Sequence, residues 1–436
     1  MNKRTLIRDL PGKHGESVTL GGWVDKVKDQ KRMQFLVLRD HTGYLQVVNE
    51  KGSTPYDNVV SSLSNESVVY VGGKVIPNPS VRTGNGLELR LESIDVANTP
   101  SGSLPIDASS NIDARLDWRY LDLRDPKKLL IFKIQTTAEH AMREWWMNNG
   151  FMEIHSPKLL GAASESGAEL FKLDYFGKTA CLAQSPQFYK QMAMSAGFDR
   201  VFEIGPVFRA NSSHTNRHDT EFTSVDMEVS FVNSHEDVME IEENWLNYVL
   251  SRVKTAHGEE IKRSYGQELE IPSVPFPRVT MDEAYRILDS QGYVVPREQK
   301  GDLDPEGERR LAKHIKETFN HDFVFVTDYP AKSRAFYHMR HEDRPDITKS
   351  FDLIWKGTEV TTGAQREHRY DRLVNQATEK GIDPQSVSSY TDFFKYGVPP
   401  HGGLGFGLTR MLMNITGLEN VKEVTFVYRG PNRLTP

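Results

Sequence analysis

The chain has 436 residues, a formal net charge of −6 and a hydrophobic fraction of 38%. This length allows two or three domains with cores of their own, and the composition is that of an ordinary globular protein. No run approaches the ~18 apolar residues of a membrane-spanning helix, and the first residues lack an apolar export signal. Cys181 is the only cysteine, which excludes an intramolecular disulfide and a cysteine-based zinc cluster. We expect a cytoplasmic protein without a membrane partner.

The acidic net charge excludes a protein that is basic throughout, but it leaves room for a local basic groove. The first 100 residues hold 13 Lys plus Arg against 11 Asp plus Glu, so the N-terminal part is the more basic one. We expect that part to meet any polyanionic partner.

Short segments with alternating or β-branched patterns fill the N-terminal part, and turn signals separate them. They are 17–27, 33–40, 43–50, 67–76 and 87–97. Five strands in about 80 residues predict a small closed barrel, for which an OB-fold is the natural candidate. We place this domain at 1–100 and a linker or hinge at 101–126.

From residue 127 onward, helical periodicity alternates with strands, which predicts an α+β domain around an antiparallel sheet over 127–436. The expected helices are 127–148, which ends before Asn149-Gly150, then 236–256, 305–319, 367–381 and 387–396. The expected strands include 350–355 and 358–362.

The most informative stretch is 202–228, which reads FEIGPVFRANSSHTNRHDTEFTSVDME. It predicts two antiparallel strands joined by a polar loop. Arg209 can hold a phosphate with two N–H groups, Phe222 can stack a base, and Glu221 can accept from an exocyclic amine. The same loop and second strand add Arg217, His218 and Asp226. The alternative is a hairpin with a solvated charged face.

A second segment, 399–410, reads PPHGGLGFGLTR and is rich in glycine. It lacks the Gly-Lys-Ser/Thr ending of a P-loop. Glycines allow close backbone approach, and Arg410 opens a helix where phosphate charge is welcome. The alternative is a flexible turn with a surface arginine.

These two segments resemble motifs 2 and 3 of the class II aminoacyl-tRNA synthetases, and nearly the whole chain follows the compact aspartyl group of that family. The resemblance implies that Arg209 and Arg410 clamp the two ends of a bent ATP. It also implies a Mg²⁺ site beside the phosphates, formed by Asp352, Glu359 and Thr362.

The resemblance also indicates the amino-acid pocket. Residues 184–191, QSPQFYKQ, look like the aspartyl signature. Lys190 and Arg366 would neutralise the side-chain carboxylate of L-aspartate and would be left unpaired against an amide. The other expected contacts to the amino acid are Glu165 in a loop over the site, Gln187, Asp226 and Thr362.

The N-terminal barrel resembles the family's anticodon-binding domain. Phe35 could stack an anticodon base, while Lys28 and Gln46 would contact phosphate and base edges. The alternative for Phe35 is the barrel core. Pro157 in HSPKL matches a motif 1 proline at a dimer interface, which implies a homodimer.

Two departures from the family pattern stand out. Asn211 takes the place of the usual Glu two residues after the motif 2 arginine, which leaves that residue's contribution open. Gln30-Lys31-Arg32 replaces a common Gly-Gly turn before the Phe35 strand, which could change anticodon discrimination.

We predict an ATP-dependent ligase that activates L-aspartate and transfers it to tRNA(Asp), with tRNA(Asn) open as a second acceptor. Three alternatives remain: an asparaginyl synthetase, a paralogue that works without tRNA, and an OB-type nucleic-acid-binding protein with a degenerate catalytic domain. Arg209, Arg410, Asp352 and Glu359 argue against degeneration, whereas Asn211 keeps it open.

Overall fold

A computed structural model describes residues 4–161, 169–212, 215–296 and 301–436. The chain divides into two compact units, Met1–Leu129 and Leu130–Pro436. The division falls in the first turn of helix α4 (Pro126–Asn148), so the expected hinge at 101–126 belongs to the first unit.

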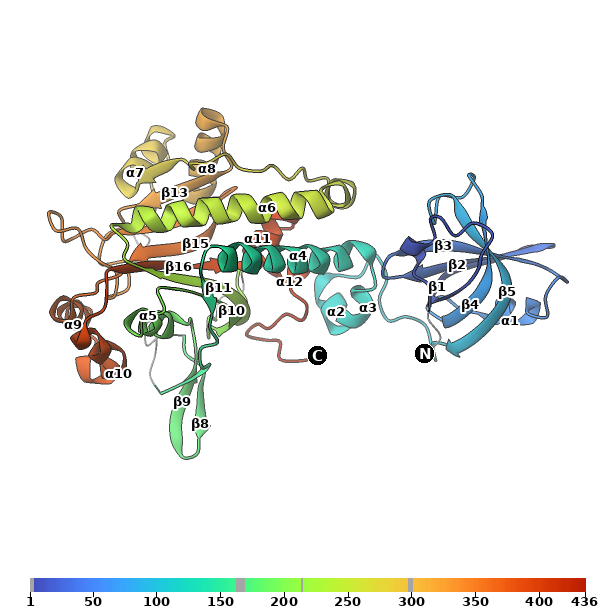
Figure 1. Ribbon diagram of the computed structural model, residues 1–436, viewed down its shortest axis with the longest axis horizontal. Coiled ribbons are helices and arrows are strands. Elements are labelled where there is room, and N and C mark those ends of the chain that lie inside the picture. Colours follow the sequence, from blue (N-terminus) through green and yellow to red (C-terminus); the bar gives the residue numbers. More distant parts are fainter. Residues whose placement is uncertain (1–3, 162–168, 213–214, 297–300) are drawn as a thin grey trace. The chain divides into compact units, whose positions relative to one another are not determined.

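The first unit is built on a closed barrel with strand order β1-β2-β3-β5-β4, drawn in blue in Figure 1. Its strands are β1 (Ser17–Asp29), β2 (Met33–Asp40), β3 (Gly43–Glu50), β4 (Val68–Pro77) and β5 (Leu87–Asn98). Alternate side chains such as Leu36, Leu38 and Leu45 fill the interior because successive residues of a strand face opposite sides. This confirms the predicted barrel, and a short helix α1 (Asp57–Ser62) interrupts it after β3.

The segment after the barrel contains two short helices, α2 (Ile112–Asp117) and α3 (Arg119–Asp122). Asn111 caps α2 by accepting from the backbone N–H of Ala114 at 2.9 Å. Arg119 and Asp122 form a buried ion pair at 2.5 Å. Composition predicted a linker here, but these local bonds give the segment ordered structure.

The second unit contains a mixed sheet with strand order β12-β13-β14-β15-β16-β11-β10-β6 (Figure 1). The central pairs are antiparallel, as predicted, while β12-β13 and β10-β6 are parallel. The strands are β6 (Met152–Glu153), β10 (Arg200–Phe208), β11 (Glu221–Ser230), β12 (Arg278–Thr280), β13 (Phe323–Thr327), β14 (Ser350–Trp355), β15 (Thr358–Gln365) and β16 (His401–Gly407).

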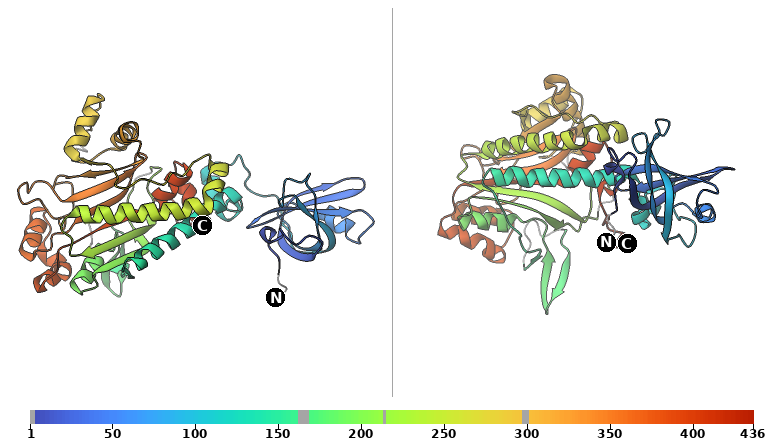
Figure 2. Two further views of the ribbon diagram at one scale, coloured as in Figure 1. Left: turned by 45° about the horizontal axis from the view of Figure 1, so that its top comes forward. Right: turned by 45° about the vertical axis from the view of Figure 1, so that its right-hand side comes forward.

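Two long helices, α4 and α6 (His235–Tyr265), pack side by side along this sheet (Figures 1 and 2). Trp146 of α4 stacks on Trp245 of α6, with ring centroids 4.8 Å apart. Trp245 also meets Phe406 of β16 edge-on at 5.2 Å. A capping box at Ser234 starts α6. The helices therefore support one face of the sheet with a continuous aromatic contact.

The remaining elements lie around the sheet. They are a small sheet of β7 (Leu159–Leu160), β9 (Lys178–Leu182) and β8 (Lys172–Tyr175), and the helices α5 (Gln187–Ser195), α7 (Met281–Ser290), α8 (Pro305–Phe319), α9 (Tyr370–Glu379), α10 (Ser388–Thr391), α11 (Leu408–Thr416) and α12 (Val421–Val424). The helices expected at 236–256 and 305–319 are confirmed as α6 and α8.

Candidate active site

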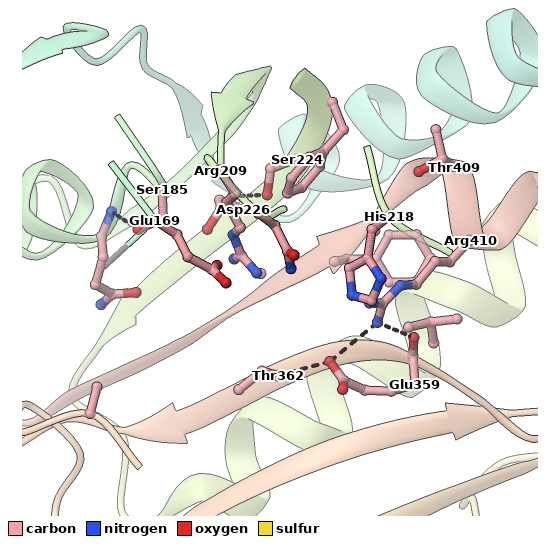
Figure 3. Close-up of a pocket in the computed structure, with 18 of the residues that line it drawn as sticks. Glu169, Ser185, Arg209, His218, Ser224, Asp226, Glu359, Thr362, Thr409 and Arg410 are labelled. Carbon is pink, nitrogen blue, oxygen red and sulfur yellow. Dashed lines mark hydrogen bonds and ion pairs between the residues drawn. The ribbon is translucent and has the colours of Figure 1, made fainter. Parts of the chain in front are cut away.

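A cavity of about 350 Å³ lies on the sheet of the second unit, and residues of β11, β15 and β16 line it. Figure 3 shows its two ends: Glu169 and Ser185 lie at one end, and His218, Thr409 and Arg410 lie at the other. Arg209 and Asp226 lie between them. The cavity therefore brings together side chains from segments far apart in the sequence.

Arg209 follows the last residue of β10, and its backbone N–H donates to Thr220 O at 3.0 Å. Its guanidinium carbon lies 5.4 Å from the centroid of the Phe222 ring. The side chain is exposed and makes no ion pair in the described residues. On this wall of the cavity, the Phe222 ring can stack on a base and the Arg209 guanidinium can donate to a phosphate.

At the far end, Arg410 opens the first turn of α11 and reaches back to β15. Its Nη1 donates to the backbone oxygen of Glu359 at 2.7 Å and lies 3.4 Å from Glu359 Oε1. Thr362 Oγ1 donates to the same carboxylate oxygen at 3.3 Å (Figure 3). Glu359 and Thr362 therefore present side-chain oxygens beside an arginine.

Arg217 and His218 line the same end of the cavity. Arg217 Nη1 pairs with Glu308 Oε2 of α8 at 3.1 Å. Burial and the charge of Glu359 raise the pKa of Glu308 to about 8, while Arg217 and Arg410 oppose the shift. Burial and the charge of Arg410 lower the pKa of His218. Because His218 is therefore neutral near pH 7, it can lie beside Arg410 without repelling that positive charge.

The middle of the cavity leads to a buried ionic cluster. Asp226 accepts from Ser224 Oγ at 2.5 Å and from Lys190 Nζ at 3.0 Å. Lys190, only 2% exposed, also donates to Leu404 O at 2.8 Å and lies 3.4 Å from Glu228 Oε2. Oxygen atoms of the protein therefore already surround the ammonium group of Lys190. Asp226 lines the cavity, whereas Lys190 does not.

Arg366 completes this cluster and lines the cavity itself. Its Nε donates to Glu228 Oε1 at 2.9 Å. Although burial acts in the opposite direction, the charges of Arg366 and Lys190 lower the pKa of Glu228. Gly403 makes room for this carboxylate, since a Cβ there would lie 2.1 Å from Glu228 Oε2. The pair of cations and the pair of anions balance one another.

Of the other residues expected to contact the amino acid, Gln187 lines the cavity and donates to Gln191 Oε1 at 2.8 Å. Glu165 lies outside the described residues. Glu169, four residues on, lines the cavity, and its backbone oxygen accepts from Ala210 N at 2.8 Å.

Glu221 does not line the cavity, so its expected contact with an exocyclic amine stays a prediction without support from the lining. Phe222, Ser224 and Asp226 line the cavity from β11, whereas Glu221 is exposed and absent from the lining. Successive side chains of a strand face opposite sides, which turns Glu221 away when Phe222 faces in.

Asp352 also takes a different place from the one expected of a metal ligand. It pairs with Thr362 across β14 and β15, but it is buried and forms an ion pair with Arg334 Nη2 at 2.5 Å. Arg334 lines the cavity, whereas Asp352 does not. Asp352 thus holds Arg334 through Oδ2, while its buried Oδ1 has no hydrogen-bond partner in the described residues, and its role as a metal ligand stays a prediction.

The sequence interpretation missed several lining residues, of which Arg334, Tyr337, His338 and Asp219 carry polar groups. The first three come from one segment between β13 and β14. That segment has no strand or helix periodicity, and the run SRAFYH was its only signal.

In the barrel, Phe35 and Lys28 face each other across β1 and β2, and Gln46 lies on β3. Phe35 is half-buried and lies outside the barrel core, unlike its neighbours Leu36 and Gln34. Gln46 Nε2 donates to Glu88 Oε2 at 2.8 Å. Phe35 therefore lies on the outer face of the barrel, and the alternative interpretation, in which it belongs to the barrel core, is not supported.

Pro157 is exposed between β6 and β7, near the exposed side chains of Met152 and Leu159. None of the helices in the described ranges is long and apolar enough to cross a membrane.

Two family models match this chain. Residues 111–428 match the model described as tRNA synthetases class II (D, K and N). Residues 18–97 match the model described as OB-fold nucleic acid binding domain. The two matched ranges contain the cavity and the barrel, respectively.

Relatives match along nearly the whole chain. An "Aspartate--tRNA(Asp/Asn) ligase" of Aeropyrum pernix is 42% identical over 429 residues, covering 97% of this chain and 96% of the relative. An "Aspartate--tRNA(Asp) ligase" of Pyrococcus abyssi is 41% identical and covers 97% of each.

Solved structures agree with the fold. The asparaginyl-tRNA synthetase of Pyrococcus horikoshii complexed with asparaginyl-adenylate has a TM-score of 0.92 at 32% identity, covering 100% of both chains. A putative aspartyl-tRNA synthetase from Leishmania major Friedlin has a TM-score of 0.90 at 29% identity, covering 100% of this chain and 95% of that one.

Proposed function

Because this chain belongs to the class II tRNA synthetases of the D, K and N group, we infer that it is an aspartate–tRNA ligase. It uses ATP to convert L-aspartate to aspartyl-adenylate and then transfers the aspartyl group to the 3′ end of tRNA(Asp), with tRNA(Asn) open as a second acceptor. The observation that carries this function is the full-length match to aspartate ligases, and a cavity lined by Arg209, Arg366 and Arg410 supports it.

The first step is attack of the aspartate α-carboxylate on the α-phosphorus of ATP, with pyrophosphate leaving. We propose that Arg209 stabilises the charge that develops at the α-phosphate and that Arg410 holds the far end of the triphosphate. Phe222 stacks the base. Arg217 and His218 support the phosphates from the adjoining loop. The protein thus acts through position and charge, and no side chain forms a covalent intermediate.

For the amino acid, we propose that Asp226, Gln187 and Glu165 receive the α-ammonium group and that Thr362 makes a further contact. Arg366 receives the side-chain carboxylate directly, because it lines the cavity. Lys190 acts from beneath through Asp226, at 3.0 Å. Lys190 and Arg366 are already paired with Asp226 and Glu228, so an aspartate side chain adds a negative charge that these cations must share, whereas an asparagine amide adds none.

The residues also fit Mg²⁺. Within the described residues, no three His, Cys, Asp or Glu side chains gather as a metal site made by protein alone. Glu359 and Thr362 both turn oxygens into the cavity, and magnesium shares its oxygen ligands with nucleotide phosphates. These two residues would hold the ion, which would neutralise phosphate charge when bound.

In the transfer step, the terminal ribose hydroxyl of the tRNA attacks the adenylate carbonyl. We propose that the outer face of the barrel receives the anticodon, with Phe35 stacking a base and Lys28 and Gln46 contacting phosphate and base edges. The half-buried Phe35, outside the barrel core, supports this role.

We also propose a homodimer through the surface around Pro157. Met152 and Leu159, on either side of it, are 46% and 48% exposed, and β6 is the last strand of its sheet. Exposed apolar side chains beside an open strand edge favour a symmetric contact. Analytical ultracentrifugation of the protein and of Leu159→Asp tests it: the variant should sediment at half the mass.

One observation favours a second candidate: the asparaginyl enzyme of Pyrococcus horikoshii superimposes with a TM-score of 0.92. Pyrophosphate exchange into ATP, measured with aspartate and asparagine in parallel, decides between the two. Aspartate should support exchange and asparagine should not. Charging of purified tRNA(Asp) and tRNA(Asn) then defines the acceptor, and exchange with asparagine alone would overturn the aspartate assignment.

A further inference from the structure

Asp219 lines the cavity but has no role in the activation and transfer steps. The residue is only 8% exposed. Its Oδ2 is buried and has no hydrogen-bond partner in the described structure. Buried polar atoms are nearly always paired, so an orphaned acceptor beside a ligand cavity points to a donor supplied by the ligand.

The backbone around Asp219 is fixed on both sides. The Tyr428 hydroxyl donates to His218 O at 3.2 Å. Thr220 N donates to Arg429 O at 3.0 Å, and Thr220 O accepts from Arg209 N at 3.0 Å. The residues before and after Asp219 are thus tied to the C-terminal segment and to the end of β10. A fixed backbone holds the orphaned oxygen in place before any ligand arrives.

The surroundings limit what this ligand donor can be. The neighbouring charges of Arg410 and Arg209 lower the pKa of Asp219, but burial outweighs them and raises it to about 7. A phosphate oxygen cannot donate, and above pH 7, where Asp219 is ionised, it would face a negative charge. The α-ammonium of the amino acid is assigned to Asp226, nearer the Ser185 end, whereas His218 lies at the Arg410 end in Figure 3.

The nucleobase of the nucleotide can supply such a donor. Phe222, three residues beyond Asp219, offers its ring to the same cavity. A purine stacked there has an exocyclic amine at its edge, and a carboxylate is a suitable acceptor for such an amine. Resting on the proposed ATP site, we propose that the Asp219 side chain accepts a hydrogen bond from the 6-amino group of adenine and selects ATP by it.

The test compares ATP with purine riboside 5′-triphosphate, which lacks only the 6-amino group, in aspartate-dependent pyrophosphate exchange. The wild-type protein should prefer ATP in kcat/KM by about 10- to 100-fold, the range of one hydrogen bond to a charged group. Asp219→Leu should bring the ratio close to one, chiefly by raising KM for ATP. Asp219→Asn retains an acceptor oxygen and should keep part of the preference.

A purely structural role for Asp219 would lower exchange with both nucleotides equally and leave their ratio at the wild-type value, which would overturn the proposal. Equal use of both nucleotides by the wild-type protein would overturn it without any variant, should Asp219→Leu fail to fold. Glu317→Gln, an exposed carboxylate change on α8, is the matched control and should leave the ratio unchanged. Exchange driven by asparagine would refute the proposed function alone, since the nucleotide ratios would still report on Asp219.

Discussion

The two ends of the cavity hold their cations in different ways. Arg209 is exposed and makes no ion pair among the described residues, and Arg410 Nη1 lies 3.4 Å from the nearest carboxylate oxygen of Glu359. Lys190 and Arg366, at the amino-acid end, are buried and already bound to Asp226 and Glu228. At one end, the phosphates of a nucleotide supply the negative charge that the arginines lack. At the other end, the amino acid enters an ionic cluster whose charges already balance.

This difference bears on selectivity. The nucleotide end should bind any triphosphate, because its arginines attract negative charge and offer paired N–H groups to phosphate oxygens. A buried neutral cluster accepts a new carboxylate only if its hydrogen bonds rearrange to pair every charge. The amino-acid end is therefore the end that can distinguish an acid from an amide.

The largest expected effect is at the nucleotide end. Arg209→Ala should lower aspartate-dependent pyrophosphate exchange by about 10³-fold, since it removes a donor at the developing charge. Because Arg209 is exposed and has no ion pair with any residue that the structure describes, the thermal midpoint of the variant should stay close to that of the wild type. Steady-state exchange and calorimetry measure the two quantities, and near-normal exchange would contradict the assigned role.

At the amino-acid end, Lys190→Met should damage both activity and stability. It leaves Asp226 and Glu228 buried with one cation fewer, at a cost of about 3 kcal/mol of unfolding free energy. Aspartate activation should fall by about 100-fold or more. Denaturant unfolding and exchange assays check both changes, with Lys172→Met on β8 as an exposed lysine control. Unchanged use of aspartate would remove Lys190 from the pocket.

A substitution in the barrel tests whether the first unit contributes to tRNA charging and not to amino-acid activation. Phe35→Ala should reduce tRNA charging by about tenfold, the value of one lost stacking contact. Pyrophosphate exchange should stay normal, because Phe35 belongs to the first unit. Parallel measurement of both activities decides the matter, and an equal loss in both would mean that Phe35 serves folding.

The smallest effect concerns a carboxyl group behind the cavity. Glu242 of α6 accepts from the Thr361 hydroxyl of β15, and burial raises its pKa from 4.5 to about 8. Between these values the folded protein keeps a proton that the unfolded chain releases, so this group's contribution to stability falls as pH rises. Glu242→Gln has no titrating group at this position, so the variant should not lose this stability as pH rises.

The measurement is the unfolding free energy of wild type and Glu242→Gln at pH 6 and pH 8. The variant should gain on the wild type by about 1–2 kcal/mol over this interval. A constant difference between the two proteins would show that Glu242 does not titrate in it.

Sequence reasoning found the residues whose spacing is set by a local motif. Arg209, Phe222 and Arg410 could be identified because short hairpins and helix starts have readable signals, and the cavity brings all three together. Glu221 lies outside the cavity lining, and the alternation of strand residues beside Phe222 already indicates this in the sequence.

Other residues could not be placed in this way. Asp352 and Thr362 are cross-strand partners, yet only the position of Arg334 decides that Asp352 is covered. Arg334 itself and Asp219 come from irregular backbone, where no periodicity reports which way a side chain points. Long-range packing fixes these residues, and one sequence contains no direct record of it.

Gly403 has a consequence for variation in this chain. A side chain there would collide with the backbone oxygen of Met227 at 2.2 Å as well as with Glu228. Neither obstacle can withdraw, since one is main chain in the neighbouring strand and the other is bound to Arg366. In a saturation library selected for growth, this codon should tolerate only synonymous changes, even though the residue has no reactive group.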